Sequence, residues 1–256
     1  MKNIKYFAVL ALLLMVGCKK KDLDMTVLNK SLLNGAEFTE INVSDAWDVT
    51  IVQDEQTSGV TLEYSAFLEE YLNVTLTGKT LNIGFNQSLN LPVNTVIKAK
   101  INTKTFQKLS AKAAVRITLE GDFSGEDLAI TLDDASKCSG GSLSASRCEL
   151  QLHDASRFNG NLTADLMIAE LDDDSRIITN AGQVRKIELS AKSASFLNMS
   201  HTPVEEAIVT MEDGSEATMY VNSTIKGSLK SASKLYYYGH PTVDLDCDIS
   251  SFHMPL

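Results

Sequence analysis

The sequence has 256 residues, of which 23 are Lys or Arg and 33 are Asp or Glu, so the formal net charge is −10. Without a leader, this length fits one domain of about 220 residues, an ordinary size for an all-β fold. The acidic balance argues against nucleic acid or an anionic lipid surface as the partner.

Residues 1–17 have the layout of a lipoprotein signal peptide. Lys2 and Lys5 form a basic start, and the apolar stretch at 6–16 is too short to span a bilayer. The ending MVGC, residues 15–18, resembles a bacterial lipobox, in which cleavage precedes the cysteine and lipid is attached to it. An ordinary secretory signal with a stray cysteine is the alternative. We expect lipidation at Cys18, membrane contact through that lipid, and a place in the envelope of a Gram-negative bacterium. The outer membrane is the expected site, on its periplasmic side or at the cell surface.

The rest of the chain divides into three parts. Residues 18–35 hold the lipidated cysteine and the polar segment KKKDLDMTVLNKSLLN, which we interpret as a tether. The folded domain is expected at 36–245, and a C-terminal tail at 246–256.

The first part of the domain combines an early coil with an insertion. DAWDVTI (45–51) aligns with AAVRITL (113–119), which predicts that both segments belong to one column and that Trp47 plugs its open end. Between them, residues 59–86 show alternating strands, a tight turn at 77–79 and a short helical turn at 66–72. We expect an N-terminal antiparallel β excursion that caps the stack, because an exposed sheet edge invites aggregation.

A short phrase then recurs with a nearly constant period. LDDASKCSG (132–140) returns as LHDASRFNG (152–160) and LDDDSRIIT (171–179), with looser versions at 211–219 and 229–237. A period of about 20 residues is the signature of stacked structural repeats. The serines that mark the phrases are Ser136, Ser156, Ser175, Ser195, Ser215 and Ser233, and Val115 takes the same place one step earlier.

The segments between the phrases predict strands. LAITL (128–132), CELQL (148–152) and MIAEL (167–171) alternate in polarity, which is typical of a strand with one buried face. Leucine-rich repeats have a similar period but need a helical half, and no helical stretch fits inside these units. The remaining fold is an all-β, single-stranded parallel β-helix with coils of about 20 residues.

Stacking predicts which residues face inward. Positions four before and two after the marker are apolar in every coil, so they should line the interior. The marker should sit in a turn, where a small residue before it permits a tight bend. The two files are Ala111, Leu132, Leu152, Leu171, Ala191, Met211 and Leu229, and Ile117, Cys138, Phe158, Ile177, Leu197, Ala217 and Leu235.

Charged residues beside the marker form the candidate site. The simplest interpretation is a ladder of surface ion pairs, in which a basic column neutralises stacked aspartates. The alternatives are a calcium site on the aspartates, an acidic sugar held by the basic residues, or a polysaccharide lyase. Short coils disfavour the lyase, because they leave no loops to wall a cleft. The aspartate column is Asp134, Asp154, Asp173 and Asp213, and the basic column is Lys137, Arg157 and Arg176.

Other chemistry has little support. The histidines lack a metal-binding spacing, no G-x-S-x-G is present, and no glycine-rich phosphate loop occurs. We therefore expect no catalytic residue and no cofactor. Cys138 and Cys148 stand where other coils carry apolar residues, which favours buried thiols, although a disulfide between them stays open.

Three features together resemble a known family, the head GIN domain, described as an auto-transporter adhesin domain and found largely in bacterial lipoproteins. They are the opening FTEINVSDAWDVTIVQ (38–53), the serial corners DDAS, HDAS, SAKSAS and KSAS, and the closing LKSASKLYYYGHPTV (229–243). The resemblance covers about 36–243 and implies a right-handed parallel β-helix with no established catalytic activity. The corners depart from the family, because Asp, Ala and Ser often replace its glycines.

These observations lead to one expected function and one alternative. We expect a lipid-anchored envelope protein whose non-catalytic β-helix serves adhesion, recognition or scaffolding. Its partner would be a protein or a glycan, with oligomerisation as an option. The alternative is a carbohydrate-binding or polysaccharide-processing protein that uses the aspartate and basic columns.

Overall fold

The structure, a computed structural model, describes residues 23–256. The predicted signal peptide at 1–17 and the predicted lipidation site Cys18 lie outside the described residues. Across 23–256, no helix has the length and apolar character needed to cross a membrane.

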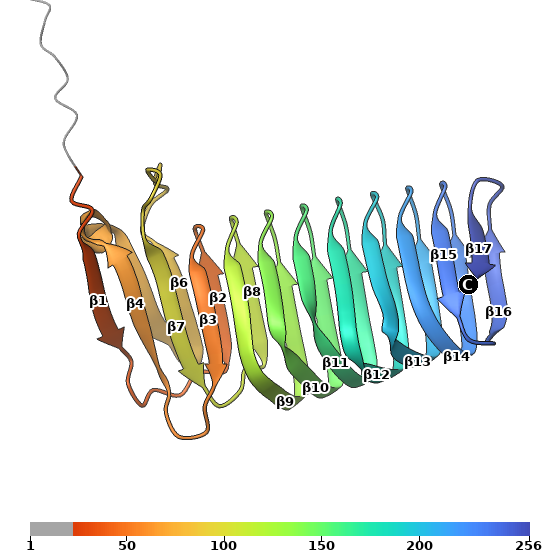
Figure 1. The fold of residues 1–256 in the computed structure, drawn as a ribbon, viewed down its shortest axis with the longest axis horizontal. Helices are drawn as coiled ribbons and strands as arrows, with labels where there is room; N and C mark the ends of the chain where they lie inside the picture. The colour runs from red at the N-terminus through yellow and green to blue at the C-terminus, as the bar shows by residue number, and fades with distance from the viewer. Residues whose placement is uncertain (1–22) are drawn as a thin grey trace, which may run out of the picture.

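The described chain forms one sheet of seventeen strands wound into a column, with β1 at one end and β16 and β17 at the other (Figure 1). A single 3₁₀ helix, η1 (Ala66–Tyr71), interrupts the strands within 23–256. The strands are β1 (Val27–Leu32), β2 (Glu40–Ser44), β3 (Asp48–Gln53), β4 (Gly59–Ser65), β5 (Leu72–Thr77), β6 (Thr80–Phe85), β7 (Ile97–Thr103), β8 (Lys108–Lys112), β9 (Arg116–Leu132), β10 (Lys137–Leu152), β11 (Arg157–Leu171), β12 (Arg176–Ala191), β13 (Phe196–Met211), β14 (Glu216–Leu229), β15 (Lys234–Tyr238), β16 (Thr242–Cys247) and β17 (Phe252–Pro255).

Each strand from β9 to β14 supplies one coil. The strand is bent near its middle, and the bend coincides in several coils with a register shift, such as that between Ser139 and Ser142 in β10. Both halves pair in parallel with the coils before and after. Leu132, Leu152 and Leu171 are register partners in three consecutive coils. The predicted parallel β-helix is confirmed, with about seven turns.

The two predicted apolar files line the interior. All of their members are buried, so every coil places a side chain from each half-strand into one continuous core. The marker serines are also inside the column, where Ser136, Ser156 and Ser175 have hydroxyls without a hydrogen-bond partner. An inward serine at the end of each turn leaves room for the bulky leucines beside it. The serine is therefore a packing residue, because its hydroxyl never reaches solvent.

The early coil joins the column as predicted, but in an unexpected place. Val49 on β3 is the register partner of Ile117 on β9, which confirms the alignment of the two segments. However, β3 also pairs with β7, and β2 pairs with both β6 and β8. The β2–β3 coil therefore lies between the β6–β7 coil and the β8–β9 coil. Trp47 is fully buried and packs on Phe85 with ring centroids 5.7 Å apart, so it is an internal residue and does not plug the open end.

The antiparallel excursion is confirmed, with two corrections. β4 pairs antiparallel with β7, and β5 with β6, through a turn in which Gly78 has a φ of 62°. β6 and β7 then rejoin the column in parallel, so only β1, β4 and β5 lie outside the parallel stack. The predicted tether at 18–35 is too long, because β1 pairs antiparallel with β4 and extends the folded domain to Val27.

The predicted C-terminal tail is also wrong, because residues 246–256 belong to the fold. β16 pairs with β14, and β17 pairs with β15, which completes a final coil beyond the Tyr236–Tyr238 run. In that run, Tyr237 points inward and is 8% exposed, while Tyr238 points outward and stacks on Tyr220 at 6.5 Å. The aromatic run is therefore part of the penultimate coil.

Candidate functional site

One edge of the column is a file of identical tight turns. In the turn 133–136, the Ser136 N–H donates to the Asp133 carbonyl oxygen at 3.2 Å, and Asp134 and Ala135 have φ of 53° and 61°. Positive φ at both central positions defines a type I′ turn. The Ala135 N–H donates to the Asp154 carbonyl oxygen at 2.8 Å, which ties each turn to the next. We call this file the turn edge; it comprises 133–136, 153–156, 172–175, 192–195, 212–215 and 230–233.

The aspartate column stands on the turn edge with exposed carboxylates. Asp134, Asp154 and Asp173 follow one another in adjacent coils, because each holds the same turn position. Ser193 takes this position in the next coil, which separates Asp213 from the other three. Among residues 23–256, no group of three or more His, Cys, Asp or Glu side chains is placed to hold a metal ion. Calcium at the four aspartates stays a prediction.

The basic column has one more member than the sequence analysis assigned. Lys137 is the register partner of Arg157, and Arg157 of Arg176. On the other side, Lys137 pairs in register with Arg116, which extends the basic column to four consecutive coils. Arg116 was not predicted because Val115 replaces the marker serine in its coil. Its place directly after the marker position, like that of Lys137 and Arg157, could have indicated it. All four stand on the outer side of the strand half that follows the turn.

The predicted ladder of ion pairs between the two columns is wrong. Arg176 Nη2 lies 3.0 Å from Asp174 Oδ1, and Asp174 holds the turn position next to the aspartate column. Within the described chain, no acidic side chain forms an ion pair with Arg116, Lys137 or Arg157. Two unit charges at the coil spacing of about 4.8 Å repel by about 0.9 kcal/mol in water. The basic column thus carries like charge that its surroundings do not pair.

An ion pair between coils forms elsewhere on the turn edge. Lys192 Nζ lies 3.1 Å from Asp172 Oδ2. Burial opposes ionisation of Asp172, but hydrogen bonds from Ser193 and Lys192 outweigh it and hold the pKa of the carboxyl below its usual value. The same contact raises the pKa of Lys192. Opposite charges one coil apart can therefore meet on this edge, which shows that geometry does not prevent pairing there.

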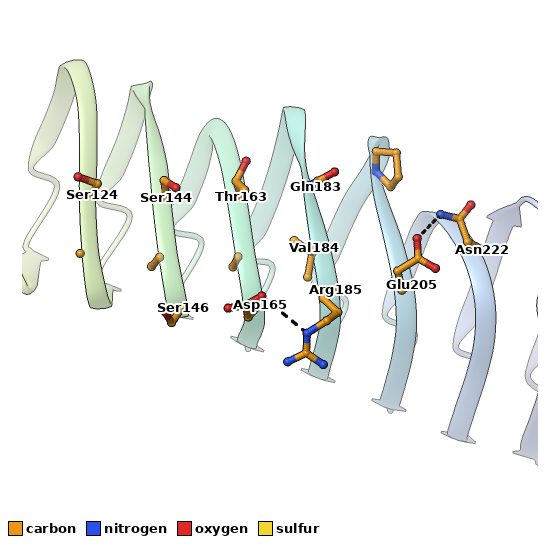
Figure 2. A pocket seen from close by; sticks show the side chains of 14 residues that line it. Ser124, Ser144, Ser146, Thr163, Asp165, Gln183, Val184, Arg185, Glu205 and Asn222 are labelled. Atoms are coloured by element: carbon orange, nitrogen blue, oxygen red, sulfur yellow. Dashed lines mark hydrogen bonds and ion pairs between the residues drawn. The ribbon is translucent and has the colours of Figure 1, made fainter.

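A shallow groove runs along the opposite edge, where each coil bends (Figure 2). Its volume is about 700 Å³, and it extends from β9 to β14. At the coil spacing this is a length of roughly 24 Å. One wall is polar, the floor consists of small side chains, and the second wall is mostly charged. The first wall holds Ser124, Ser144, Thr163 and Gln183, the floor Gly125, Ala145, Ala164 and Val184, and the second wall Ser146, Asp165, Arg185 and Glu205.

Most charged side chains of the second wall are paired with neighbouring side chains. Arg185 Nε lies 3.7 Å from Asp165 Oδ1, and Asn222 Nδ2 donates to Glu205 Oε1 at 2.8 Å, as Figure 2 shows. The hydroxyls and amide of the first wall remain exposed and repeat once per coil. The groove thus offers neutral polar contacts to an extended partner. The groove was not predicted from the sequence, although small and hydroxyl residues recur between the phrases and could have indicated it.

The predicted buried thiols are confirmed. Cys138 and Cys148 are free and buried, and burial raises the pKa of each thiol to about 12. A thiol with such a pKa is almost wholly protonated near neutral pH, so neither cysteine is a nucleophile. Cys247 is free and partly exposed in the last coil.

The fold and its edges define the class of protein: a parallel β-solenoid with long, regular faces of exposed polar side chains. The chain belongs to the family described as "Putative auto-transporter adhesin, head GIN domain", whose family model matches residues 37–241. The resemblance inferred from the opening, the corners and the closing segment is thereby confirmed.

Solved structures share the fold along nearly the whole chain. An adhesin from Parabacteroides merdae, named as putative, superimposes with a TM-score of 0.82 at 15% identity, covering 90% of this chain and 96% of that one. A "putative adhesin" from Parabacteroides distasonis gives 0.80 at 16% identity, covering 91% and 98%. A "Putative lipid binding protein" from the same species gives 0.79 at 14%, also covering 91% and 98%. A search of curated proteins gave no match.

Proposed function

We propose that this protein is a lipid-anchored component of the cell envelope and that its β-solenoid is a non-catalytic module for adhesion, recognition or scaffolding. The observation that carries the proposal is the uniformity of the coils. Each coil from β9 to β14 has a four-residue turn at one edge and a bend at the other. The faces are consequently long and regular, and the groove at the bend edge is shallow and open. Such faces suit an extended partner better than a small substrate, which needs a concave pocket.

The lipid anchor is tested in cells. Full-length protein is compared with Cys18→Ala, in which the lipidated residue is removed. We expect the unaltered protein in the membrane fraction, labelled by a radioactive fatty acid, and the variant in the soluble fraction. Unchanged membrane attachment and labelling of Cys18→Ala would refute the lipid anchor.

The recognition module is tested by adhesion. Cells that carry the anchored protein should bind to envelope extracts or host surface preparations more strongly than cells without it. The recognition proposal is wrong if neither adhesion nor co-purification of an envelope component depends on the protein.

One observation favours a narrower second candidate, carbohydrate binding at the basic column beside the turn edge. Among residues 23–256, the basic column forms no ion pair apart from the contact at Arg176, which leaves its charges available to an anionic ligand. Cleavage of a polysaccharide by β-elimination at the same column would release unsaturated sugars, whose double bond absorbs ultraviolet light, and hydrolysis would release new reducing ends. Absence of such products alongside binding supports a binding role.

A further inference from the structure

The basic column is a straight row of like charges on one face of the solenoid. Arg116, Lys137, Arg157 and Arg176 occupy the same position in four consecutive coils. Three steps at the coil spacing give a row roughly 14 Å long. Asp48 on β3 is the register neighbour of Arg116 and ends the row on the N-terminal side.

This arrangement is unfavourable for the isolated protein. Like charges directly opposite on neighbouring strands destabilise a sheet. The contact between Lys192 and Asp172 shows that a pairing carboxylate can be accommodated one coil away on the turn edge. Within the described chain, three of the four basic side chains nevertheless have no such partner. An anion lying across the row would remove the repulsion along its whole length.

The neighbouring outward row offers uncharged polar groups at the same spacing. Two residues further along the same strands stand Thr118, Ser139 and Asn159, which are exposed and in register with one another. A ligand held by the basic column would therefore meet hydroxyl and amide groups alongside its charged groups. Three of the four coils thus combine one positive charge with one neutral hydrogen-bonding group, while Ile178 takes the second place in the coil of Arg176. This combination suits a chain of acidic sugars.

We propose that the basic column, with the polar row beside it, is a binding site for a linear acidic polysaccharide that carries one carboxylate per sugar residue. The inference rests on the proposed recognition function and names its ligand class. The polysaccharide chain would lie parallel to the axis of the solenoid. Neighbouring sugar residues of an extended chain face opposite sides, so alternate carboxylates would lie on alternate basic side chains. In an extended polysaccharide, one sugar residue advances by a distance close to the coil spacing.

An acidic peptide fits the same row less well. In an extended peptide, side chains on one face repeat every second residue, at about 6.7 Å, whereas the coils repeat at about 4.8 Å. After one step the peptide carboxylates are already displaced from the basic groups by nearly half a coil. In a two-fold sugar chain, carboxylates on one face also repeat every second residue, but two sugar residues advance by about two coils, so these carboxylates stay in step with alternate basic groups.

The test uses the full-length lipoprotein in detergent and measures its affinity for oligomers of polygalacturonate. Neutral galactan oligomers and polyglutamate of equal length serve as comparison ligands. We expect binding of the uronate oligomer, weakening as salt is added, with little binding of galactan. The double variant Lys137→Gln with Arg157→Gln should lose about tenfold in affinity, because exposed charge contacts contribute a few-fold each.

Two control variants locate the binding. Lys108→Gln with Lys226→Gln removes the same charge from exposed positions on the opposite sheet face and should change the affinity less than about twofold. Ser144→Gln narrows the groove at the bend edge from an exposed position and should also have little effect. Circular dichroism confirms that each variant is folded.

Several results would overturn the inference. Equal losses in both charge variants would show that only net charge matters. Loss of binding in Ser144→Gln would place the ligand in the groove, and equal or tighter binding of polyglutamate would exclude a preference for sugars. In each of these cases adhesion of the anchored protein could persist, so the recognition function would stand while the assignment of this site fails. Absence of uronate binding, with adhesion intact, refutes the inference alone.

Discussion

The turns of the turn edge hold alanine in a conformation that suits glycine. Ala135, Ala194 and Ala232 have φ of 61°, 60° and 64°, and all three are exposed. The left-handed conformation costs a non-glycine residue roughly 1–2 kcal/mol. Replacement by glycine removes this strain but increases the entropy of the unfolded chain, which costs about 0.4–1 kcal/mol. We therefore predict that each Ala→Gly substitution raises the free energy of unfolding by about 0.5–1 kcal/mol, and that the three together raise it by about 1.5–3 kcal/mol.

The measurement is equilibrium unfolding in urea, followed by circular dichroism. The matched control is Ala129→Gly, because Ala129 is a half-buried residue on β9 with ordinary strand conformation. Glycine should destabilise that strand by roughly 0.5–1 kcal/mol. The reasoning is refuted if the turn substitutions lower the stability as much as the strand control does. Such a result would mean that the alanine methyl groups contribute packing that outweighs the backbone strain.

Three further predictions concern single side chains. Ser156→Ala should be neutral or raise the free energy of unfolding by about 1 kcal/mol, because its buried hydroxyl has no partner. Ser215→Ala should lower the free energy of unfolding by about 1 kcal/mol, because that hydroxyl donates to a carbonyl oxygen of the preceding coil at 3.0 Å. Urea unfolding compares the two variants, and equal losses of stability would contradict the argument. A maleimide at pH 8 should modify Cys247 well before Cys148, because burial raises the pKa of the Cys148 thiol to about 12. Mass spectrometry of the folded protein measures the two modification rates. Equal rates would contradict the prediction and show that the core opens readily. Asp248 accepts a hydrogen bond from a backbone N–H of the preceding turn at 2.7 Å, which holds its pKa at about 2, below the ordinary 3.8. The contribution of the ionised Asp248 to the stability of the last coil should therefore be complete above about pH 4 and disappear as the pH falls through 2. Hydrogen exchange in the last coil, corrected for intrinsic rates, should become faster in that pH window. In Asp248→Asn it should not change there.

The repetitive part of the fold could be predicted because each coil needs the same residue types at the same positions. Leu132, Leu152 and Leu171 are interchangeable by position, and the chain reveals this as a period in the sequence. A period also fixes the neighbours of each residue, since like positions meet like positions in a stack. The order of the coils, the two apolar files and the location of the turns all follow from this one regularity.

The parts that break the period were not predictable in the same way. Nothing in the local pattern of β2 and β3 shows that β6 and β7 return to lie beyond them, because both pairs alternate in polarity like any half-buried strand. The strand β1, which begins at Val27, has one polar and one weakly apolar face, and such a pattern does not distinguish a strand from a polar tether. In the site, the charges along the basic column were visible, but whether Arg157 finds an acidic partner depends on side-chain placement across coils. The groove depends on small differences in side-chain volume along the bend.

The position of the β2–β3 coil has a consequence for how the molecule is made. A chain that enters the envelope from its N-terminus delivers β2 and β3 before the strands that must flank them, and β8 and β9 arrive last of these. The base of the column therefore cannot close until about half of the polypeptide has emerged. Only then can the remaining coils fold one after another, each pairing with the coil that has already formed. Assembly should therefore be slow at the N-terminal end of the column and fast toward its C-terminal end, so the longest-lived partly folded state is the one whose N-terminal coils are still open.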